Sequence, residues 1–328
     1  MTHYRTVVGI DEAGLGPILG PLTVGYCAFG LPGPMTPHAL MSLDMWDALE
    51  LSRNPKDRKH KPVVCDSKKL HNPSKGVGAL EEETLGWIRA ASHPCDDYFA
   101  FHAAFCALAR EKPDAYDWYG VAPHSFPLAS TLERADLRAA RLARSMKDAG
   151  YSLQAFGVSP VFEGELNRLM HRLGNKARAE FDIIARILGP LWQQHRQVAV
   201  LCDRQGGRTR YGRALHSEFP EAQIKVFVEE KKISSYELSI PEVEGCPRMF
   251  IAFIEKGDGD HLPIALASMG AKYIREIMMN QFNAWFANYD AELKPTAGYF
   301  KDGRRWLMDS AELRRKIGVD DARLIRRR

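Results

Sequence analysis

The segment VGIDEAGLGPILGPLTV, residues 8–24, constrains the fold of this chain more than any other. An apolar run ends at two adjacent acids, Asp11 and Glu12, and a loop rich in glycine and proline leads into a second apolar run at residues 22–29. The pattern predicts two strands joined by a loop, with both acids at the end of the first strand. Adjacent carboxylates repel each other unless a cation lies between them. Taken alone, such a pair is most often a solvated turn, so its role depends on the rest of the chain.

The composition is that of a globular protein with one large domain or two ordinary ones. The chain has 328 residues, of which 45% are hydrophobic and 26% charged, and its net charge of +4 permits a polyanionic partner without requiring one. Six scattered cysteines without a C-x-x-C pair favour reduced, buried thiols over disulfides or a zinc site. Because no run approaches 18 apolar residues and no signal-peptide pattern begins the chain, we expect a soluble, cytoplasmic protein without a membrane partner.

Hydrophobic periodicity predicts alternating strands and helices. The predicted strands are residues 6–10, 22–29, 198–202, 223–228 and 248–254. The predicted helices are residues 80–91, 131–149, 163–194 (with a break near Gly174 or Gly189) and 263–288. A strand pair followed by strands separated by helices favours an α/β domain with a mixed sheet.

Two regions are interpreted as additions to this core. Residues 93–150 have proline-rich junctions and are interpreted as an insertion, and residues 233–247 as a largely polar connection. The last three residues, 326–328, are all arginine and are interpreted as a solvated tail, with a weak phosphate contact as the alternative.

A third acid, Asp203, ends the apolar run at residues 198–202 as Asp11 ends its own run. The ends of neighbouring strands meet at one edge of a sheet, which is where open α/β sheets bind ligands. A basic, glycine-containing loop with Arg204 and Arg208 follows Asp203. The alternative is an ordinary aspartate in the turn after a strand.

Glu276 follows Lys272 by one turn of the predicted helix 263–288, so the two side chains share a face. Alone, the pair is more typical of a surface ion pair, which contributes less than ~1 kcal/mol. Small residues within ALASMGAK, residues 265–272, would let this helix lie close to the sheet and bring Glu276 toward the strand-end acids. The preceding acid-rich loop, residues 255–261, is expected to be a solvated turn or a helix cap.

These elements together supply carboxylates for an all-oxygen site of the kind that Mg²⁺ or Mn²⁺ prefers. The four candidates are Asp11, Glu12, Asp203 and Glu276. Two such ions about 4 Å apart can activate a water and stabilise the leaving oxygen of a phosphodiester. Cations are also needed to hold a polyanion, and the candidates are Lys68, Lys69, Lys272, Arg204 and Arg208.

The order of several motifs resembles type 2 ribonucleases H, the ribonuclease HII and HIII enzymes that cut the RNA strand of RNA–DNA hybrids. The blocks are GIDEAGLGPILGPLTV, then CDSKKL, then the strand ending at Asp203, then KGDGDHLPIALASMGAKYIRE. Two further segments are similar to the family, VSPVFEGELNRLMHRL and TAGYFKDGRRWL. The resemblance touches about two-thirds of the chain.

This resemblance implies a ribonuclease H-like fold, a mixed five-stranded sheet flanked by helices, with a helical insertion and a C-terminal helical extension. The catalytic domain would span residues 1–307, with the insertion at about residues 93–150, and residues 308–328 would form a basic C-terminal tail. The implied metal ligands are Asp11, Glu12, Asp203 and Glu276.

The resemblance also implies contacts with the substrate. Lys69 and Lys272 match positions that hold phosphates, and Tyr299 matches a tyrosine that stacks on the sugar at an RNA-to-DNA junction. Gly14, Leu15 and Gly16 match a loop whose amides approach a ribose 2′-hydroxyl, the group that distinguishes RNA from DNA.

The expected function is metal-dependent endonucleolytic hydrolysis of RNA in RNA–DNA hybrids, or in duplexes with embedded ribonucleotides, by a monomer. A two-metal mechanism would leave 5′-phosphate and 3′-hydroxyl ends. Leu15, Arg204 and Phe300 depart from residues usual in the family and leave the substrate preference open. Asp258 matches a common family position and is assigned a supporting role rather than direct ligation, and His261 is a candidate for assisting product release.

Two other functions compete with this one. A non-catalytic protein that binds RNA–DNA hybrids or RNA on the same fold is consistent with Leu15 and with the insertion. A dinucleotide-binding enzyme is disfavoured, because Pro17 and Pro21 interrupt the glycine loop where a helix N-terminus would have to follow.

Overall fold

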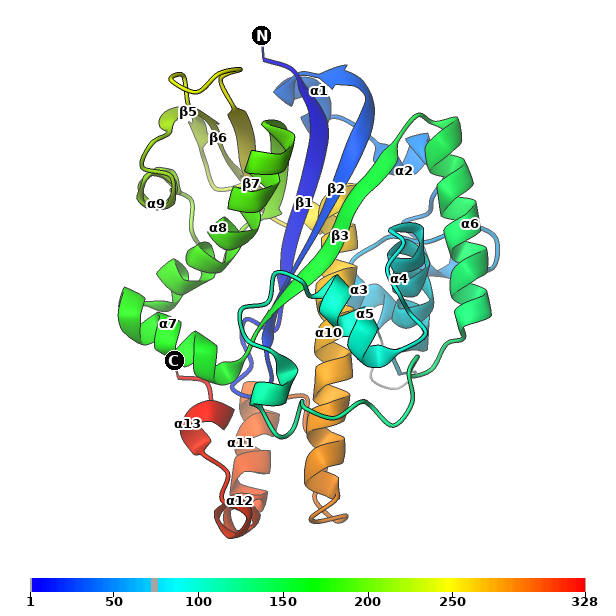
Figure 1. Cartoon of the computed structure of the whole chain (residues 1–328), viewed down its shortest axis with the longest axis vertical. Helices are drawn as coiled ribbons and strands as arrows, with labels where there is room; N and C mark the ends of the chain where they lie inside the picture. Colours follow the sequence, from blue (N-terminus) through cyan, green and yellow to red (C-terminus); the bar gives the residue numbers. More distant parts are fainter. Residues whose placement is uncertain (1, 72–75, 328) are drawn as a thin grey trace.

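A seven-stranded mixed sheet forms the centre of the molecule, in a computed structural model that describes residues 2–71 and 76–327 (Figure 1). The strand order is β3-β2-β1-β4-β7-β6-β5, with β1 parallel to β4, β4 parallel to β7, and the other neighbours antiparallel. The strands are β1 (Tyr4–Ala13), β2 (Leu22–Met35), β3 (Ser152–Val161), β4 (Gln197–Asp203), β5 (Gln223–Glu229), β6 (Ile233–Ser239) and β7 (Arg248–Ile254). The predicted α/β class with a mixed sheet flanked by helices is confirmed.

The sheet has more strands than the five predicted, because β3 and β6 lie in segments whose sequence does not alternate clearly. β6 falls within residues 233–247, which were predicted to be a polar connection, and that prediction is wrong for its first half. Tyr236 and Leu238 of β6 are buried, and the hydroxyl of Ser234 donates to the carbonyl of Thr209 at 2.6 Å. Pairing with β5 and β7 therefore satisfies a strand that looks polar in the sequence.

Helices cover both faces of the sheet. They are α1 (Pro37–Met41), α2 (Met45–Ala48), α3 (Ser67–Leu70), α4 (Gly78–Ala90), α5 (Tyr98–Phe105), α6 (Leu132–Asp148), α7 (Glu163–Leu173), α8 (Lys176–His195), α9 (Gly212–Glu218), α10 (Leu262–Ala287), α11 (Phe300–Asp309), α12 (Ala311–Ile317) and α13 (Asp321–Leu324). Short 3₁₀ helices are η1 (Pro55–Lys59), η2 (Pro113–Ala115) and η3 (Gly257–Gly259). The predicted helix 163–194 is divided at Gly174, whose φ of 78° ends α7 in the left-handed region.

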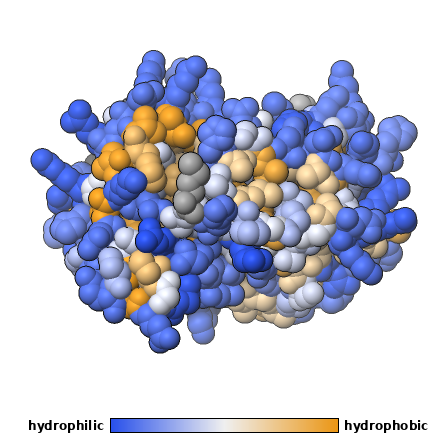
Figure 2. Space-filling model, turned by 90° about the horizontal axis from the view of Figure 1, so that it is seen from above, coloured by the Kyte–Doolittle hydropathy of each residue, from blue (hydrophilic) through white to orange (hydrophobic). Residues whose placement is uncertain are grey.

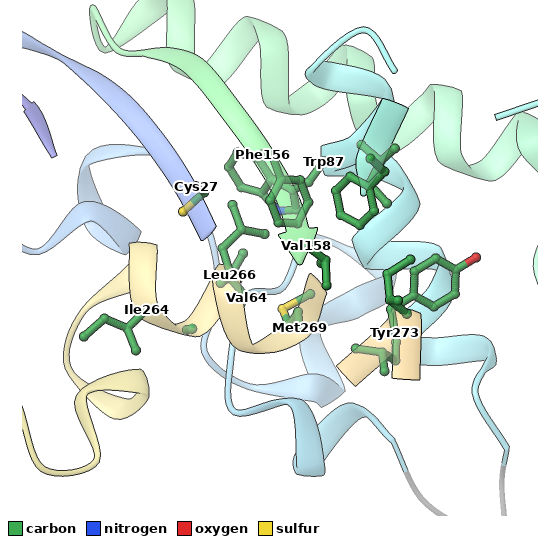
Figure 3. Close-up of a cluster of buried hydrophobic side chains, with 14 of the residues drawn as sticks. Cys27, Val64, Trp87, Phe156, Val158, Ile264, Leu266, Met269 and Tyr273 are labelled. Carbon is green, nitrogen blue, oxygen red and sulfur yellow. The ribbon is translucent and has the colours of Figure 1, made fainter. Parts of the chain in front are cut away.

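Each face of the sheet buries its own hydrophobic cluster. Val7 of β1 packs in the cluster beneath α10 and α4, whereas Val8 and Ile10 pack in the cluster beneath α8. Figure 3 shows part of the first cluster, in which Met269 and Tyr273 of α10 lie among side chains from the sheet and from α4. The alternation along β1 thus reflects two-sided burial, as expected for a central strand.

Helix α10 lies directly on β1 and β2 because glycines remove the side chains between them. A Cβ atom added to Gly9 would lie 2.0 Å from the carbonyl carbon of Pro263, and one added to Gly25 would lie 2.0 Å from the carbonyl oxygen of Ala267. The expected close approach of this helix to the sheet is confirmed. It brings the N-terminal half of α10 to the strand ends that carry the acids.

Residues 93–150, which were predicted to be an insertion, contain α5, η2 and α6, and α6 packs against α4 (Figure 1). At the C-terminus, Leu324 is buried in the main core, and Arg326 is only 4% exposed. The prediction of a solvated tail is therefore wrong for Arg326, because its guanidinium group is enclosed by the loop after β1 and donates to the carbonyls of Gly14 and Pro17.

The remaining general expectations concern the cysteines and the membrane. All six cysteines are free thiols; five are buried and Cys246 is partly exposed. Within the described part of the chain, no helix combines the length and apolar character needed to span a bilayer. The exposed apolar side chains Val226 and Phe227 lie on the edge strand β5, and Figure 2 shows hydrophobic residues gathered on the side where Figure 1 places the β5–β6 hairpin.

Candidate functional site

The acids at the ends of β1 and β4 meet at one edge of the sheet. In the parallel pairing of these strands, Ile10 is opposite Cys202, so the next residues in register are Asp11 and Asp203. Asp11 is buried, and Glu12, the next residue of β1, is partly exposed. The structure therefore brings together three of the four predicted ligands, Asp11, Glu12 and Asp203.

These three carboxyl groups repel one another in a poorly hydrated environment. Burial and then the charges of Glu12 and Asp203 raise the pKa of Asp11 well above its ordinary value. Burial and then the charges of Asp203 and Glu180 raise the pKa of Glu12 to about 8. The pKa of Asp203 rises to about 6, chiefly through burial, with a contribution from the charge of Asp258. The group therefore stabilises added positive charge.

Backbone and hydroxyl donors hold the carboxylates in place. Asp11 accepts a hydrogen bond from the backbone N–H of Glu12 at 2.7 Å and another from the hydroxyl of Ser268 on α10. Asp203 accepts from the backbone N–H of Gly257 at 2.8 Å. Lys256, with φ of 56°, turns the chain at the start of η3, so that the loop after β7 returns to the end of β4.

Asp258, for which the sequence predicts a supporting role, lies within electrostatic reach of this group of acids. It lies in η3, next to the glycine that binds Asp203, and its charge helps to raise the pKa of Asp203. Its own pKa is raised by burial and by the charge of Asp66. The motif KGDGDH contained the signal, but a glycine-rich loop has no periodicity that would show which of its acids points toward the sheet.

The structure does not bring Glu276 to the other acids. Ser268 of α10 contacts Asp11, and Glu276 lies eight residues further along the same helix, which is about 12 Å along its axis. Glu276 instead pairs with Lys272 at 2.5 Å and with His71 at 3.3 Å. Glu276 was predicted to lie at the strand ends with the other acids. Along α10, it is Ser268, about two turns earlier, that contacts Asp11 there.

We use the term acid cluster for Asp11, Glu12, Asp203 and Asp258, and Lys68 is the basic residue that acts on most of it. Its charge lowers the pKa of Glu12, Asp203 and Asp258. Lys68 lies in the first turn of α3, where Asp66 caps the helix by accepting from the Lys68 N–H at 3.0 Å.

The other predicted cations have different surroundings. Lys69 acts on Asp258, Lys272 is paired with Glu276, and Arg204 pairs with Glu255 at 2.9 Å while its charge also lowers the pKa of Asp203.

Arg208 packs on aromatic rings, and no direct pairing with the acids at the strand ends is seen among the described residues. It lies over the rings of Phe181 and Tyr211, and its charge lowers the pKa of Glu180. His261, the candidate for product release, is buried at the start of α10, and burial lowers its pKa.

The loop after β1 is packed closely at Gly14, whereas the space beside Gly16 is free of other atoms. Gly14 has φ of 86°, and a Cβ atom there would lie 2.4 Å from Nε of Arg275. At Gly16, by contrast, no atom lies within 4 Å of the Cβ position. Leu15 is partly buried, and its carbonyl accepts from Nζ of Lys176 at 2.7 Å. Tyr299 is 48% exposed, with the guanidinium carbon of Arg275 5.5 Å from its ring centroid.

Three residues around this loop were not predicted. Arg275 donates to the carbonyls of Leu19 and Ala297, and Glu163 accepts from the N–H of Gly20 at 3.0 Å. The third is Arg326, whose backbone N–H also reaches the loop and donates to the carbonyl of Ile18 at 2.9 Å. No sequence signal separates it from the two arginines that follow it.

The acid cluster fits a divalent metal in its chemistry but does not form a closed ligand set. Its donors are all carboxylate oxygens, which hard cations such as Mg²⁺ and Mn²⁺ prefer, and burial, followed by the charges of neighbouring acids, raises the pKa of Asp11, Glu12 and Asp203. Among residues 2–71 and 76–327, no three His, Cys, Asp or Glu side chains converge as a metal-binding group.

Comparison with known proteins finds solved structures that are similar to this chain. No protein-family model matches the sequence, and no curated protein matches it. The structures include the complex of PCNA with ribonuclease HII from Archaeoglobus fulgidus, at 14% identity over 98% of this chain and 94% of that one, with a TM-score of 0.41. They also include Bst-RNase HIII in complex with Mn²⁺, at 14% identity over 98% of this chain and 65% of that one, with a TM-score of 0.43.

A third similar structure is ribonuclease H2 from Pyrococcus horikoshii OT3, at 12% identity over 97% of this chain and 92% of that one, with a TM-score of 0.36. All three are ribonucleases H, the family that the sequence motifs resemble. At these identities and TM-scores, the likeness decides nothing about activity, which rests on this chain's own residues.

Proposed function

We propose that this protein is a divalent-metal-dependent endonuclease that hydrolyses the RNA strand of RNA–DNA hybrids. The observation that carries the proposal is the acid cluster, because neighbouring carboxylates that repel one another at a poorly hydrated sheet edge have no stabilising role without a cation. Asp11, Glu12, Asp203 and Asp258 would hold Mg²⁺ or Mn²⁺. A bound divalent cation supplies Lewis acidity and lowers the pKa of a water molecule, and a pair of them supports in-line displacement at phosphorus.

The surrounding residues supply what a nuclease needs for binding. Lys68 lies within electrostatic reach of the acids and offers a charge to the phosphate beside the scissile bond. The open backbone at Gly16 allows close approach of a ribose, so the loop after β1 is the candidate reader of the 2′-hydroxyl. Tyr299 is exposed enough to stack on a sugar. Cleavage would leave 5′-phosphate and 3′-hydroxyl ends.

The test is cleavage of an end-labelled RNA–DNA hybrid with Mg²⁺ or Mn²⁺, comparing the wild type with Asp11→Asn, Asp203→Asn and Asp258→Asn. Each substitution is expected to lower the rate by about 100-fold or more, because it removes a charge from the proposed metal site. Glu276→Gln is the matched control and is expected to stay within about tenfold of the wild type, because Glu276 lies outside the acid cluster. Equal activity in all variants would overturn the proposal.

The same assay separates catalysis from binding. A wild-type protein that binds the hybrid but shows no metal-dependent cleavage would favour the non-catalytic binder. A duplex with a single embedded ribonucleotide, compared with a full hybrid, shows which substrate the loop reads. Leu15 is partly buried and lacks a basic group, so we expect no preference for the embedded ribonucleotide from this position.

A further inference from the structure

A second region of the molecule concentrates positive charge away from the acid cluster. Residues 53–61 and helix α6 contain ten basic and four acidic residues, a charge of +6, whereas the whole chain has +4. We call this region the α6 surface. Its basic residues are Arg53, Lys56, Arg58, Lys59, Lys61, Arg134, Arg138, Arg141, Arg144 and Lys147.

The loop and the helix form one surface because α6 binds the loop's backbone. Arg138 donates to the carbonyl of Arg58 and also pairs with Glu82 at 3.0 Å, and it is almost completely buried. Arg141 donates to the carbonyl of His60 at 3.2 Å. These bonds hold the basic residues of the loop beside those of the helix, so the spacing of the charges is set by the fold.

Two hollows lie between the loop and the helix, with volumes of about 580 Å³ and 490 Å³, and Arg141 lines both. Arg144 lines the first and Arg134 the second, and their side chains are 86% and 67% exposed. Hydrophilic side chains also line the margin of Figure 2 on the side where Figure 1 places α6. The arginine side chains therefore face solvent at the edges of the two hollows.

Many of these cations have no acidic partner. In the described parts of the chain, Lys56, Lys59, Lys61 and Lys147 form no ion pair within 4.0 Å. The ten-residue step from Arg134 to Arg144 spans about 15 Å of helix, which matches about four phosphates of one strand at 3.4 Å each. Arg134 and Arg144 also meet Glu82 and Asp148, but their side chains stay largely exposed, so together with the lysines they are complementary to a phosphodiester backbone.

The surface offers little for reading bases or entering a lipid layer. The ring of Trp46 is covered by the guanidinium group of Arg53 at 4.0 Å, and Trp46 is itself buried. Leu137 is the large apolar side chain that α6 exposes. Without aromatic platforms or an apolar face, contacts would be confined to phosphates and independent of sequence.

We propose that the α6 surface binds the sugar–phosphate backbone of a nucleic-acid duplex at a place separate from the acid cluster. The inference rests on charge, exposure and the fixed geometry of the loop on α6, and it goes beyond the proposed hydrolysis. A duplex held there would be bound without regard to base sequence, with an affinity that falls steeply as salt rises.

The experiment measures binding of a fluorescent 30-base-pair RNA–DNA hybrid in EDTA, over a series of NaCl concentrations, so that no cleavage is required. The triple variant Lys59→Ala, Lys61→Ala, Arg144→Ala removes three exposed charges from the α6 surface and spares the buried Arg138. The control triple variant Lys225→Ala, Arg315→Ala, Lys316→Ala removes the same charge from exposed residues of β5 and α12.

The first variant is expected to bind at least about tenfold more weakly, and the slope of log K against log salt should fall by about 2 to 3, since each lost phosphate contact contributes about 0.9. The control should bind within about twofold of the wild type. Equal binding by the wild type and the first variant would overturn the proposal, as would equal losses in both variants or tighter binding of anionic vesicles than of duplex.

Failure of hydrolysis in the cleavage assay would leave this binding result unaffected, so the two proposals fail separately. Thermal unfolding of both variants shows whether the fold is kept. If the first triple variant unfolds, the pair Lys56→Ala, Lys147→Ala removes charge from the same surface, and a salt slope equal to that of the wild type would then overturn the proposal.

Discussion

At the scale of single residues, the surroundings of each carboxylate decide its chemistry. Asp11 is buried and Glu12 is partly buried among other acids, and their pKa values rise. Glu276 is also largely buried, which by itself would raise its pKa, but the hydrogen bond with His71 and the charge of Lys272 lower it to about 2. Asp11 and Glu12 therefore favour binding of a cation, whereas Glu276 already has cationic partners.

The low pKa of Glu276 predicts how its contribution to stability depends on pH. Because this pKa is about 2 in the folded state and 4.5 ordinarily, the ionised carboxylate stabilises the folded protein above pH 4.5, and this contribution is lost as the pH falls from 4.5 toward 2. We expect Glu276→Gln to lower the free energy of unfolding by about 1–3 kcal/mol at pH 7, and by less at pH 3. Urea unfolding at pH 7, 5 and 3 measures this.

The exposed residue Glu312, on α12, provides the control for that series. Glu312→Gln is expected to change the free energy of unfolding by less than about 0.5 kcal/mol at every pH. A loss at Glu276 that stays constant from pH 7 to pH 3 would contradict the ion-pair explanation.

At the scale of elements, α10 connects the sheet to the acid cluster through a contact that requires glycine. Gly25→Ala would place a methyl group 2.0 Å from the carbonyl oxygen of Ala267, so the helix would have to shift. We expect a loss of about 1–3 kcal/mol in the free energy of unfolding. Gly33→Ala, in the same strand with nothing within 4 Å, is expected to change stability by less than about 0.5 kcal/mol. Thermal unfolding of both variants tests the pair.

The loop after β1 depends on a residue near the other end of the chain. Arg326 donates to the carbonyls of Gly14 and Pro17, so Arg326→Ala would leave these acceptors without that donor. We expect a loss of about 1–3 kcal/mol in stability and faster amide exchange in residues 14–20, measured by hydrogen–deuterium exchange.

Arg327→Ala is the control for this prediction, because its side chain is exposed and its bond to Asn167 is made by the backbone. Exchange in residues 14–20 should then match the wild type. If Arg326→Ala also left that exchange unchanged, the C-terminal segment would not hold the loop.

At the scale of the whole molecule, the acid cluster predicts that metal binding and folding are linked. Mg²⁺ at 100 times its dissociation constant would add about 2.7 kcal/mol to stability and raise Tm by on the order of 5 °C. We expect Asp11→Asn to abolish this rise and to raise Tm in EDTA, because it removes a repelling charge. Thermal scans in EDTA and in MgCl₂ measure both effects.

Glu276→Gln is the control for metal linkage and is expected to keep the full Mg²⁺-dependent rise in Tm, since Glu276 lies outside the acid cluster. A rise of equal size in Asp11→Asn would show that Mg²⁺ acts elsewhere on the molecule.

Much of the architecture followed from local patterns. All five predicted strands are present; four of them are apolar runs that the sheet buries, and the fifth, β5, is an exposed edge strand rich in β-branched and aromatic residues. β6 was missed because its serines find partners only after the strand pairs, which no local pattern reports. The pairing of Asp11 with Asp203 could be predicted, since parallel strands meet at their carboxyl ends.

The sequence by itself determined the α/β class, the acid pair at the end of β1 and the cations of CDSKKL, because these depend on residue type and short spacing. Only the tertiary structure decided that Asp258 joins the acids while Glu276 does not, and that Arg326 is buried in the first loop. The physical reason is that the position of a residue along α10, and the paths of the loop after β7 and of the C-terminal segment, decide which side chains meet. These paths are fixed only when the helices and strands pack together.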